Sequence, residues 1–351
     1  MRRKTRVIKA GSVSIGGNNP ISVQSMTKTP TKDVKKTVAQ ILSLEKIGCQ
    51  IVRCAVPDEE SARSLKKIKS QIHIPLVADI HFDYKLALIA IESGIDKLRI
   101  NPGNIGSLEK IKAVVAACKE RHIPIRIGVN SGSLDKKYSH PTAQNLAESA
   151  LENVALLEKA GFHEIIIAVK STSVPITLDA YRMLSKKVDY PLHIGITESG
   201  SLHQGTIRSC VGIGALLAEG IGDTLRVSLT ASPEEELSVG YAILKSLELY
   251  KSGVTIISCP TCGRCEINLA KIADTIERKI SQVKVSKPLK VALMGCVVNG
   301  PGEAKEADLG LAGGKGQGLI FVKGEIVKKV AEKDMVSEFI KIFNQQVKKN
   351  D

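Results

Sequence analysis

Tryptophan is absent from the 351 residues of the chain, and aromatic residues make up 3% of it. Proteins that bind single-stranded nucleic acid stack the bases on aromatic side chains, so this scarcity argues against such a protein. No apolar run approaches the roughly 20 residues of a membrane-spanning helix. The basic start Met-Arg-Arg-Lys-Thr-Arg is followed by no apolar segment, which argues against a secretory signal. We therefore expect a cytoplasmic protein that does not bind a membrane, and the shortage of aromatic residues counts against a nucleic-acid partner.

Sequence motifs of several common cofactor sites are also missing. Segment 211–220 is not G-x-G-x-x-G, because its third glycine comes too late, and segment 313–318 has no serine or threonine after its lysine, as a P-loop requires. We interpret the first as a helix of small residues and the second as a flexible loop. The radical-SAM spacing C-x-x-x-C-x-x-C is absent. No histidine follows His203, and Cys296 is followed by Val-Val-Asn rather than by a further C-x-x-C or a histidine pair, which argues against a structural zinc site.

The residues that are present indicate an ordinary globular protein, with 43% hydrophobic and 25% charged residues. The formal net charge of +14 is compatible with nucleic acid, with a phosphorylated substrate or with an acidic protein partner.

Short apolar runs rich in β-branched residues alternate with helical patterns over the first 250 residues. The strand-like runs are 21–26, 50–56, 75–80, 97–101, 123–130, 164–170, 192–198 and 224–230. The clearest helical segments are 34–47, 109–118, 143–160 and 233–247. Eight strands alternating with helices over this length predict an α/β fold, a (β/α)8 TIM barrel; a doubly wound sheet is the alternative. Residues 5–20 predict a hairpin around Gly11 that precedes the barrel.

The alternation stops near residue 250, and a second unit follows. Strands are expected at 254–258 and 289–294, helices at 269–280 and 336–347, and a hairpin around Gly324. We therefore divide the chain into a barrel domain, 1–250, and a small α/β domain, 253–351.

The predicted barrel strands end in polar or charged side chains. Alternate residues of a strand share a face, and the carboxyl ends of barrel strands meet at one mouth. Five cations on five strands would form a basic cup suited to an anion with several charges, most simply a diphosphate. The cations are Arg53, Arg99, Arg126, Lys170 and Arg226.

Cys259 and Cys262 have C-x-x-C spacing in a Pro/Gly loop, and Cys296 follows another strand-like run. This pattern indicates a metal or iron-sulfur site. With Cys265, the first two cysteines also reproduce the start of a bacterial ferredoxin motif, so spacing alone leaves the ligand set open. Four other cysteines stand alone in apolar or helical context and are interpreted as small buried hydrophobic residues: Cys49, Cys54, Cys118 and Cys210.

Several longer motifs resemble the 4-hydroxy-3-methylbut-2-enyl diphosphate synthase family, the iron-sulfur enzymes of the methylerythritol phosphate pathway, in their two-domain bacterial form. The motifs begin at Val23 (VQSMT), Val77 (VADIHF), Arg99 (RINPGN), Arg126 (RIGVNSGS), His193 (HIGITE), Cys259 (CPTCGR) and Met294 (MGCVVNGPGEA). The resemblance implies a barrel followed by a small iron-sulfur domain. It also implies a 4Fe-4S cluster held by Cys259, Cys262, Cys296 and Glu303, with Cys265 as a bystander.

The resemblance further implies an oxidoreductase that opens and dehydrates 2-C-methyl-D-erythritol 2,4-cyclodiphosphate with two electrons, giving 4-hydroxy-3-methylbut-2-enyl diphosphate. The five cations are then expected to bind the diphosphate, with Asn101, Asn130 and Ser228 as orienting hydrogen-bond partners. Asp79, His81, Thr197 and Glu198 are the candidates for contacting the hydroxyl groups and for protonating the leaving hydroxide. Glu198 is the preferred acid, because a closed pocket favours a neutral carboxyl.

The partners implied by the resemblance are ferredoxin or flavodoxin as electron donor and a second copy of the chain in a head-to-tail homodimer. The alternative function is a basic nucleic-acid binder that carries a cluster or zinc. Iron content and an absorption band in the visible range would distinguish the two.

Overall fold

The computed structural model describes residues 2–135, 137–281, 283, 285–296 and 305–350. The chain divides into two compact units, Met1–Tyr250 and Lys251–Asp351. Each is described by itself.

The first unit is a (β/α)8 barrel, as predicted. Its strands are parallel, and their order in the sheet is β8-β7-β6-β5-β4-β3-β10-β9. A bridge between Ile167 and Leu192 joins the two ends of this sheet and closes the barrel. The strands are β3 (Ser22–Met26), β4 (Ile51–Ala55), β5 (Leu76–Asp79), β6 (Lys97–Ile100), β7 (Ile125–Asn130), β8 (Ile165–Lys170), β9 (His193–Ile194) and β10 (Thr224–Leu225).

The last two barrel strands are much shorter than the runs 192–198 and 224–230 that were predicted. Directly beyond β9, at Gly195, the carbonyl oxygen of Arg226 occupies the space that a Cβ atom would take. The two segments continue side by side without a regular ladder, since Arg226 N still donates to Ile194 O.

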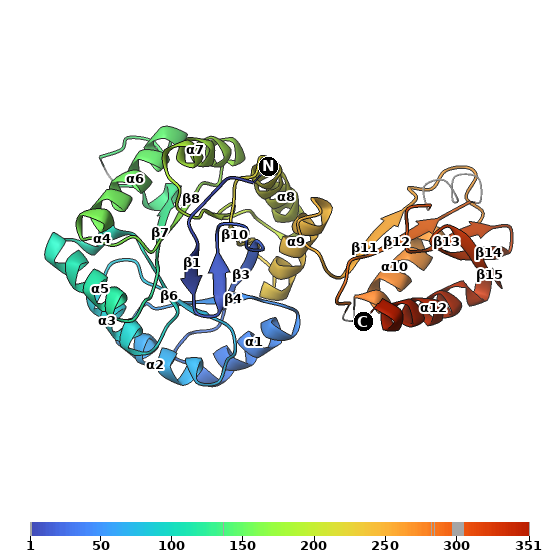
Figure 1. Ribbon diagram of the computed structural model, residues 1–351, viewed down its shortest axis with the longest axis horizontal. Helices are drawn as coiled ribbons and strands as arrows, with labels where there is room; N and C mark the ends of the chain where they lie inside the picture. Colours follow the sequence, from blue (N-terminus) through green and yellow to red (C-terminus); the bar gives the residue numbers. More distant parts are fainter. Residues whose placement is uncertain (1, 136, 282, 284, 297–304, 351) are drawn as a thin grey trace. The chain divides into compact units, whose positions relative to one another are not determined.

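Helices surround the sheet, and their apolar faces pack on its outer side (Figure 1). Asp33, Asp58 and Ser232 cap the starts of three of them by accepting hydrogen bonds from backbone N–H groups. Residues 211–218 of the segment 211–220 lie in a helix, as predicted, and Glu219 is the C-cap of that helix. The helices are α1 (Val34–Lys46), α2 (Glu59–Lys69), α3 (Tyr84–Glu92), α4 (Pro102–Ile105), α5 (Leu108–Glu120), α6 (Ala143–Lys159), α7 (Val174–Lys187), α8 (Leu202–Ala218) and α9 (Pro233–Ser246), with the 3-10 turn η1 (Ser131–Ser133) after β7.

A hairpin closes the amino-terminal end of the barrel, as predicted. Strands β1 (Ile8–Ala10) and β2 (Val13–Ile15) pair in antiparallel fashion around Gly11, whose φ is 55°. Figure 1 shows the hairpin across the centre of the ring. Its apolar side chains pack against Ile51, Val77 and Ile166 from the barrel interior, so the mouth at the other end is the open one.

The second unit is a five-stranded mixed sheet in the order β11-β12-β13-β14-β15. The predicted strands 254–258 and 289–294, the hairpin at Gly324 and both helices are present. The prediction of a flexible loop at 313–318 was wrong, because Gly313 and Gly318 are partners in an antiparallel pair. The elements are β11 (Val254–Ser258), α10 (Leu269–Ile280), β12 (Leu289–Met294), β13 (Leu309–Gly314), β14 (Gln317–Val322), β15 (Glu325–Ala331), η2 (Glu332–Asp334) and α12 (Met335–Asn350).

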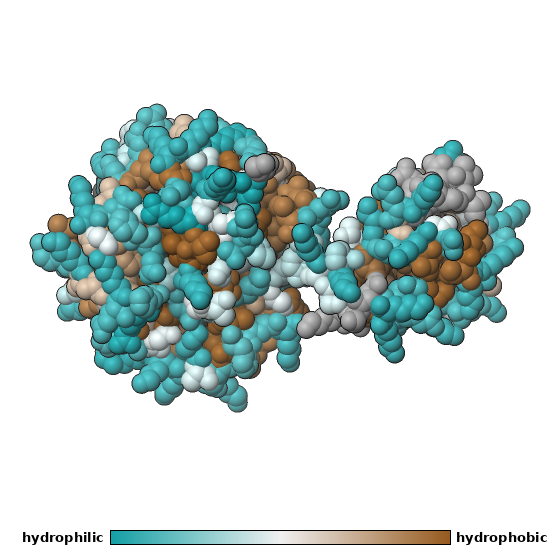
Figure 2. Space-filling model, in the orientation of Figure 1, coloured by the Kyte–Doolittle hydropathy of each residue, from teal (hydrophilic) through white to brown (hydrophobic). Residues whose placement is uncertain are grey.

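Helices α10 and α12 pack against the sheet through Ile276, Ile280, Phe339 and Phe343. On the surface of both units, the hydrophobic residues visible in Figure 2 form separate patches among hydrophilic ones.

Candidate active site at the barrel mouth

A cavity of about 190 Å³ lies at the carboxyl ends of the barrel strands. Ten side chains that the sequence nominated line it: Arg53, Asp79, His81, Arg99, Arg126, Asn130, Lys170, Thr197, Arg226 and Ser228. The alternation of strand side chains explains this convergence, because Arg53, Asp79, Arg99 and Lys170 occupy the inward-facing positions near the ends of their strands.

Asp79 is the carboxylate that holds two of the arginines in place. Arg99 Nη1 donates to Asp79 Oδ1 over 2.8 Å, and Arg53 Nε lies 3.5 Å from Asp79 Oδ2. Burial acts to raise the pKa of Asp79, but the surrounding cations Arg53, Arg99 and Arg126 outweigh it and hold that pKa well below its usual range. Asp79 is therefore ionised at neutral pH.

Glycines on neighbouring strands make room for the cations. A Cβ atom on Gly128 would lie 2.9 Å from Arg99 Nη2, and the same guanidinium donates to Gly128 O over 3.0 Å. A Cβ on Gly195 would lie 2.9 Å from Lys170 Nζ. Both values are shorter than real Cβ contacts, so alanine at either position would displace a cation of the cavity.

The positive charges of the other cations are offset to different degrees. Arg226 Nη2 lies 3.4 Å from Glu236 Oε2, a carboxylate of α9 that also binds Lys28. Burial, followed by repulsion from Arg126 and Arg226, lowers the pKa of Lys170 well below its usual value. Burial also lowers the pKa of Arg53 to about 10, which leaves this guanidinium charged.

His81 lies at the rim of the cavity with 46% of its side chain exposed. Arg99 Nη1 lies 2.8 Å from His81 Nε2, and because a guanidinium only donates, this ring nitrogen accepts. Burial and the charge of Arg99 lower the pKa of His81. The imidazole is therefore neutral near pH 7.

Two of the nominated residues do not line the cavity. Asn101 is buried after β6, and its Oδ1 has no hydrogen-bond partner among the described residues. Glu198 is exposed and follows Thr197 in a left-handed backbone conformation, with φ of 49°. The closed environment expected to favour its neutral form is absent from this structure.

The four nominated metal ligands lie in the second unit. Cys259 follows β11 and Cys296 follows β12, and these parallel strands are neighbours in the sheet. Cys259 N donates to Leu293 O over 2.9 Å. Cys262 is exposed, whereas Cys259 and Cys296 are half-buried. Glu303 lies outside the described residues.

Cys265 has a different environment from these thiols. Its Sγ donates to Ile267 O over 3.3 Å and packs at Gly295, where a Cβ would lie only 2.6 Å away. Among the described residues, no group of three or more His, Cys, Asp or Glu side chains is arranged to hold a metal ion.

The sequence interpretation missed a deeper set of polar residues inside the barrel: Gln24, Lys97, His193 and Thr224. All are almost fully buried. The strand alternation contained the signal, because Lys97 lies two residues before Arg99 on β6 and His193 lies two before Gly195.

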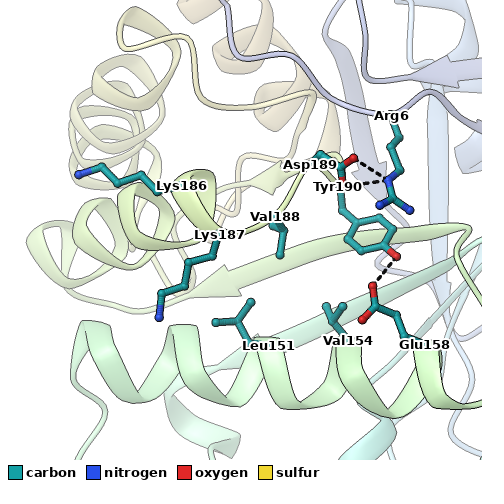
Figure 3. A pocket seen from close by; sticks show the side chains of 9 residues that line it. All are labelled: Arg6, Leu151, Val154, Glu158, Lys186, Lys187, Val188, Asp189 and Tyr190. Atoms are coloured by element: carbon teal, nitrogen blue, oxygen red, sulfur yellow. Dashed lines mark hydrogen bonds and ion pairs between the residues drawn. The ribbon is translucent and has the colours of Figure 1, made fainter.

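A larger groove of about 600 Å³ lies at the amino-terminal end of the barrel (Figure 3). Its charged groups are largely engaged with each other: Arg6 pairs with Asp189 and stacks on the Tyr190 ring, and the Tyr190 hydroxyl donates to Glu158 over 2.9 Å. It contains none of the nominated residues. Barrel enzymes carry out their chemistry at the opposite end, which favours the smaller cavity.

The fold and the cavity together define a (β/α)8-barrel protein with a cationic mouth, followed by an α/β unit that bears cysteines at its strand ends. The GcpE TIM-barrel domain matches residues 5–241, and the GcpE protein C-terminal domain matches residues 255–345. The chain belongs to the GcpE family.

Similar proteins are named 4-hydroxy-3-methylbut-2-en-1-yl diphosphate synthase (flavodoxin). The protein from Caldanaerobacter subterraneus subsp. tengcongensis is 60% identical over 352 residues and covers 99% of both chains. The one from Clostridium perfringens is 59% identical, covering 97% of this chain and 99% of its own. These relatives confirm the predicted family.

Solved structures support the barrel fold alone. Dihydropteroate synthase from Yersinia pestis has a TM-score of 0.52 at 9% identity, covering 69% of this chain and 98% of its own. 3-Dehydroquinate dehydratase from Geobacillus kaustophilus has a TM-score of 0.52 at 17% identity, covering 71% and 99%. No helix among the described residues is long and apolar enough to span a membrane.

Proposed function

We propose that the chain is an oxidoreductase that opens and dehydrates 2-C-methyl-D-erythritol 2,4-cyclodiphosphate, giving 4-hydroxy-3-methylbut-2-enyl diphosphate. The cationic cavity at the barrel mouth is the observation that carries this proposal: four arginines and a lysine face a space of about 190 Å³. Relatives that are 57–60% identical bear the name of this synthase.

The cavity binds the diphosphate through charge and through donor geometry. Each phosphate of a cyclic diphosphate has one strongly acidic P–OH group. Both groups are ionised near neutral pH, so the substrate is a dianion. Arg53, Arg99, Arg126 and Arg226 offer guanidinium donors that match phosphate oxygens, and Lys170 adds an amine. Asp79 acts as a positioning residue, because it fixes Arg53 and Arg99 and is already ionised. Asn130 and Ser228 orient the substrate, and we include the buried Asn101 in this group.

Protonation of the leaving hydroxide needs a donor at the mouth. We propose Glu198 for this role, because it directly follows Thr197, which lines the cavity. A left-handed glutamate is uncommon and persists only where its surroundings hold it. His81 and Thr197 contact the sugar-like hydroxyl groups, since both lie at the rim of the cavity.

The second unit fits an iron-sulfur cluster. Thiols follow the carboxyl ends of adjacent parallel strands β11 and β12, and an exposed cysteine lies in the loop between Cys259 and Cys265. We assign Cys259, Cys262, Cys296 and Glu303 as ligands of a 4Fe-4S cluster and Cys265 as a bystander. When bound, the cluster supplies single electrons and an iron that a weakly held carboxylate can expose. The two units, 1–250 and 253–351, are thus assigned as substrate-binding domain and cluster domain.

We also propose flavodoxin or ferredoxin as the electron donor and a head-to-tail homodimer as the active assembly. The net charge of +14 favours such acidic donors. In this dimer the barrel of one protomer receives the cluster domain of its partner.

The test is anaerobic turnover of the cyclodiphosphate with reduced flavodoxin, with the product identified by mass spectrometry. The linear butenyl diphosphate is the expected product. Glu198→Gln is expected to lower kcat by 10²-fold or more, at the scale of a lost general acid, with a smaller change in KM. Unreacted cyclodiphosphate with cluster-loaded protein would contradict the proposal, and an unchanged Glu198→Gln rate would remove Glu198 from the chemistry.

A further inference from the structure

A layer of buried polar side chains lies one step deeper in the barrel than the cavity. Lys97 on β6 and His193 on β9 have no exposed surface. Lys97 Nζ donates to Gln24 Oε1 on β3 over 3.1 Å. Strands β4 and β5 separate β3 from β6 in the sheet, so this hydrogen bond crosses the barrel interior. With Arg126 and Thr224, these residues form what we call the buried polar layer.

The hydrogen bonding of the buried polar layer is incomplete. Gln24 Nε2, both ring nitrogens of His193, Nε and Nη2 of Arg126 and Oγ1 of Thr224 lack a partner in the described part of the chain. A buried polar group without a partner is costly, and natural proteins keep few of them. Their concentration under the substrate cavity, which Arg126 also lines, indicates a functional role.

The charges that face Lys97 and His193 are mainly positive. Arg53 on β4, Arg126 on β7 and Lys170 on β8 surround them. Asp79 on β5 is already engaged by Arg53 and Arg99, and Asp223, which directly precedes Thr224, pairs with Arg2. The hairpin below the layer contributes apolar side chains only, from Ile8, Ala10 and Ile15.

The burial and the positive surroundings therefore favour the neutral forms of both bases before an anion arrives. Burial and the charges of Arg126 and Arg53 lower the pKa of Lys97 far below its usual value. Burial and the charges of Arg126 and Lys170 do the same to the pKa of His193. A dianion placed on Arg126 and Lys170 would offset this positive potential and favour the charged forms of both bases.

We propose that Lys97 and His193 take up a proton when the cyclic diphosphate dianion binds above them. The inference rests on the proposed function for the identity of the anion. The inference gives a role to residues that do not touch the substrate. Lys97 and His193 become positively charged when a negatively charged ligand binds. Binding is then coupled to pH through groups of the barrel interior, and affinity rises as the pH falls.

Proton uptake can be measured by titration calorimetry at pH 8 in two buffers of different ionisation enthalpy. The cyclodiphosphate suits this experiment, because it has no group that titrates near this pH. The wild-type chain is expected to take up on the order of one proton per ligand bound. Lys97→Met and His193→Gln should each take up fewer protons, and any uptake by Lys170 remains common to all variants.

Matched controls are His163→Gln and Lys187→Met, which remove the same groups from exposed positions at the opposite end of the barrel. Both should match the wild type. Uptake that is equal in all variants, or binding without uptake, overturns the inference and leaves the proposed function intact. Absence of binding contradicts the proposed function as well.

A second measurement does not depend on the variants folding. Nitrogen NMR of wild-type protein labelled at histidine and lysine should show the His193 ring change from neutral to imidazolium when the cyclodiphosphate is added. A ring that stays neutral, in protein whose Lys97 also shows no change in charge, overturns the inference.

Discussion

Asp79 and Lys97 show opposite ways of placing a charged side chain inside a barrel. Asp79 is surrounded by guanidinium groups that stabilise its ionised form, with Arg99 Nη1 only 2.8 Å away. Lys97 has a neutral amide oxygen as its hydrogen-bond acceptor, and burial together with the charges of Arg126 and Arg53 lowers its pKa, which favours the neutral amine. Asp79 therefore holds the arginines of the cavity in fixed positions, whereas Lys97 is a group of the barrel interior whose charge can change.

The neutral state of Lys97 predicts a dependence of stability on pH. An unfolded lysine has a pKa of about 10.4, so below that pH the unfolded chain binds a proton that the native amine does not. The free energy of unfolding should therefore rise between pH 7 and 9, by up to about 1.4 kcal/mol per pH unit from this one group. In Lys97→Met this contribution disappears.

Urea unfolding of both proteins at pH 7, 8 and 9 measures the effect. Lys97→Met should be the more stable protein at pH 7, and its stability should rise less steeply with pH. Lys187→Met serves as the control with the wild-type slope. Equal slopes for wild type and Lys97→Met would show that the native amine is protonated.

At the scale of elements, the alternation of strands and helices was sufficient to predict the barrel, and residues two apart on a strand predicted the mouth. The sequence could not show that β9 and β10 end early, because the backbone geometry there involves the close approach of Arg226 to Gly195, which lie in two segments far apart in the chain. Nor could it show that Glu198 would be exposed, since burial depends on how the loops after the strands close.

The spacing of the cysteines left open which residues of the loop after β11 bind the cluster. Cys265 Sγ donates to Ile267 O, and this hydrogen bond favours a structural role for Cys265. Cys265→Ala is therefore expected to retain the iron content and visible absorption of anaerobically prepared protein. It should lose only about 1 kcal/mol of stability, as for a small core truncation.

Cys296→Ala is the matched comparison, because this cysteine is also half-buried and directly follows Gly295, the residue at which Cys265 packs. It should lose most of its iron. Loss of iron in Cys265→Ala with retention in Cys296→Ala would reverse the ligand assignment.

At the scale of the whole molecule, the net charge of +14 predicts how the electron donor is recruited. An acidic flavodoxin is steered to a basic surface by long-range attraction, which salt screens. We expect kcat/KM for reduced flavodoxin to fall by roughly ten-fold or more between low and high salt. Turnover with dithionite as a small reductant is the control and should change much less. Equal salt dependence with both reductants would contradict steering by charge.

A head-to-tail dimer predicts complementation between inactive chains. A Cys296→Ala chain has an intact barrel, and a Glu198→Gln chain has an intact cluster domain, so a mixed dimer contains one complete site. After random exchange of subunits, half of the dimers are mixed, and activity should recover to about a quarter of the wild-type value. A mixture that is no more active than its components would mean that each chain works alone.

Binding of the cyclodiphosphate at the barrel mouth is the central claim, and titration calorimetry of the ligand into the wild-type chain and Arg126→Met tests it most directly. The wild type should bind one molecule per chain. Arg126→Met removes a buried guanidinium that lines the cavity and should weaken binding by about 10- to 100-fold, as expected for a charged hydrogen bond. Arg278→Met, on the exposed face of α10, should bind as the wild type does. Equal affinity in Arg126→Met and the wild type, or no binding in either, would contradict the account.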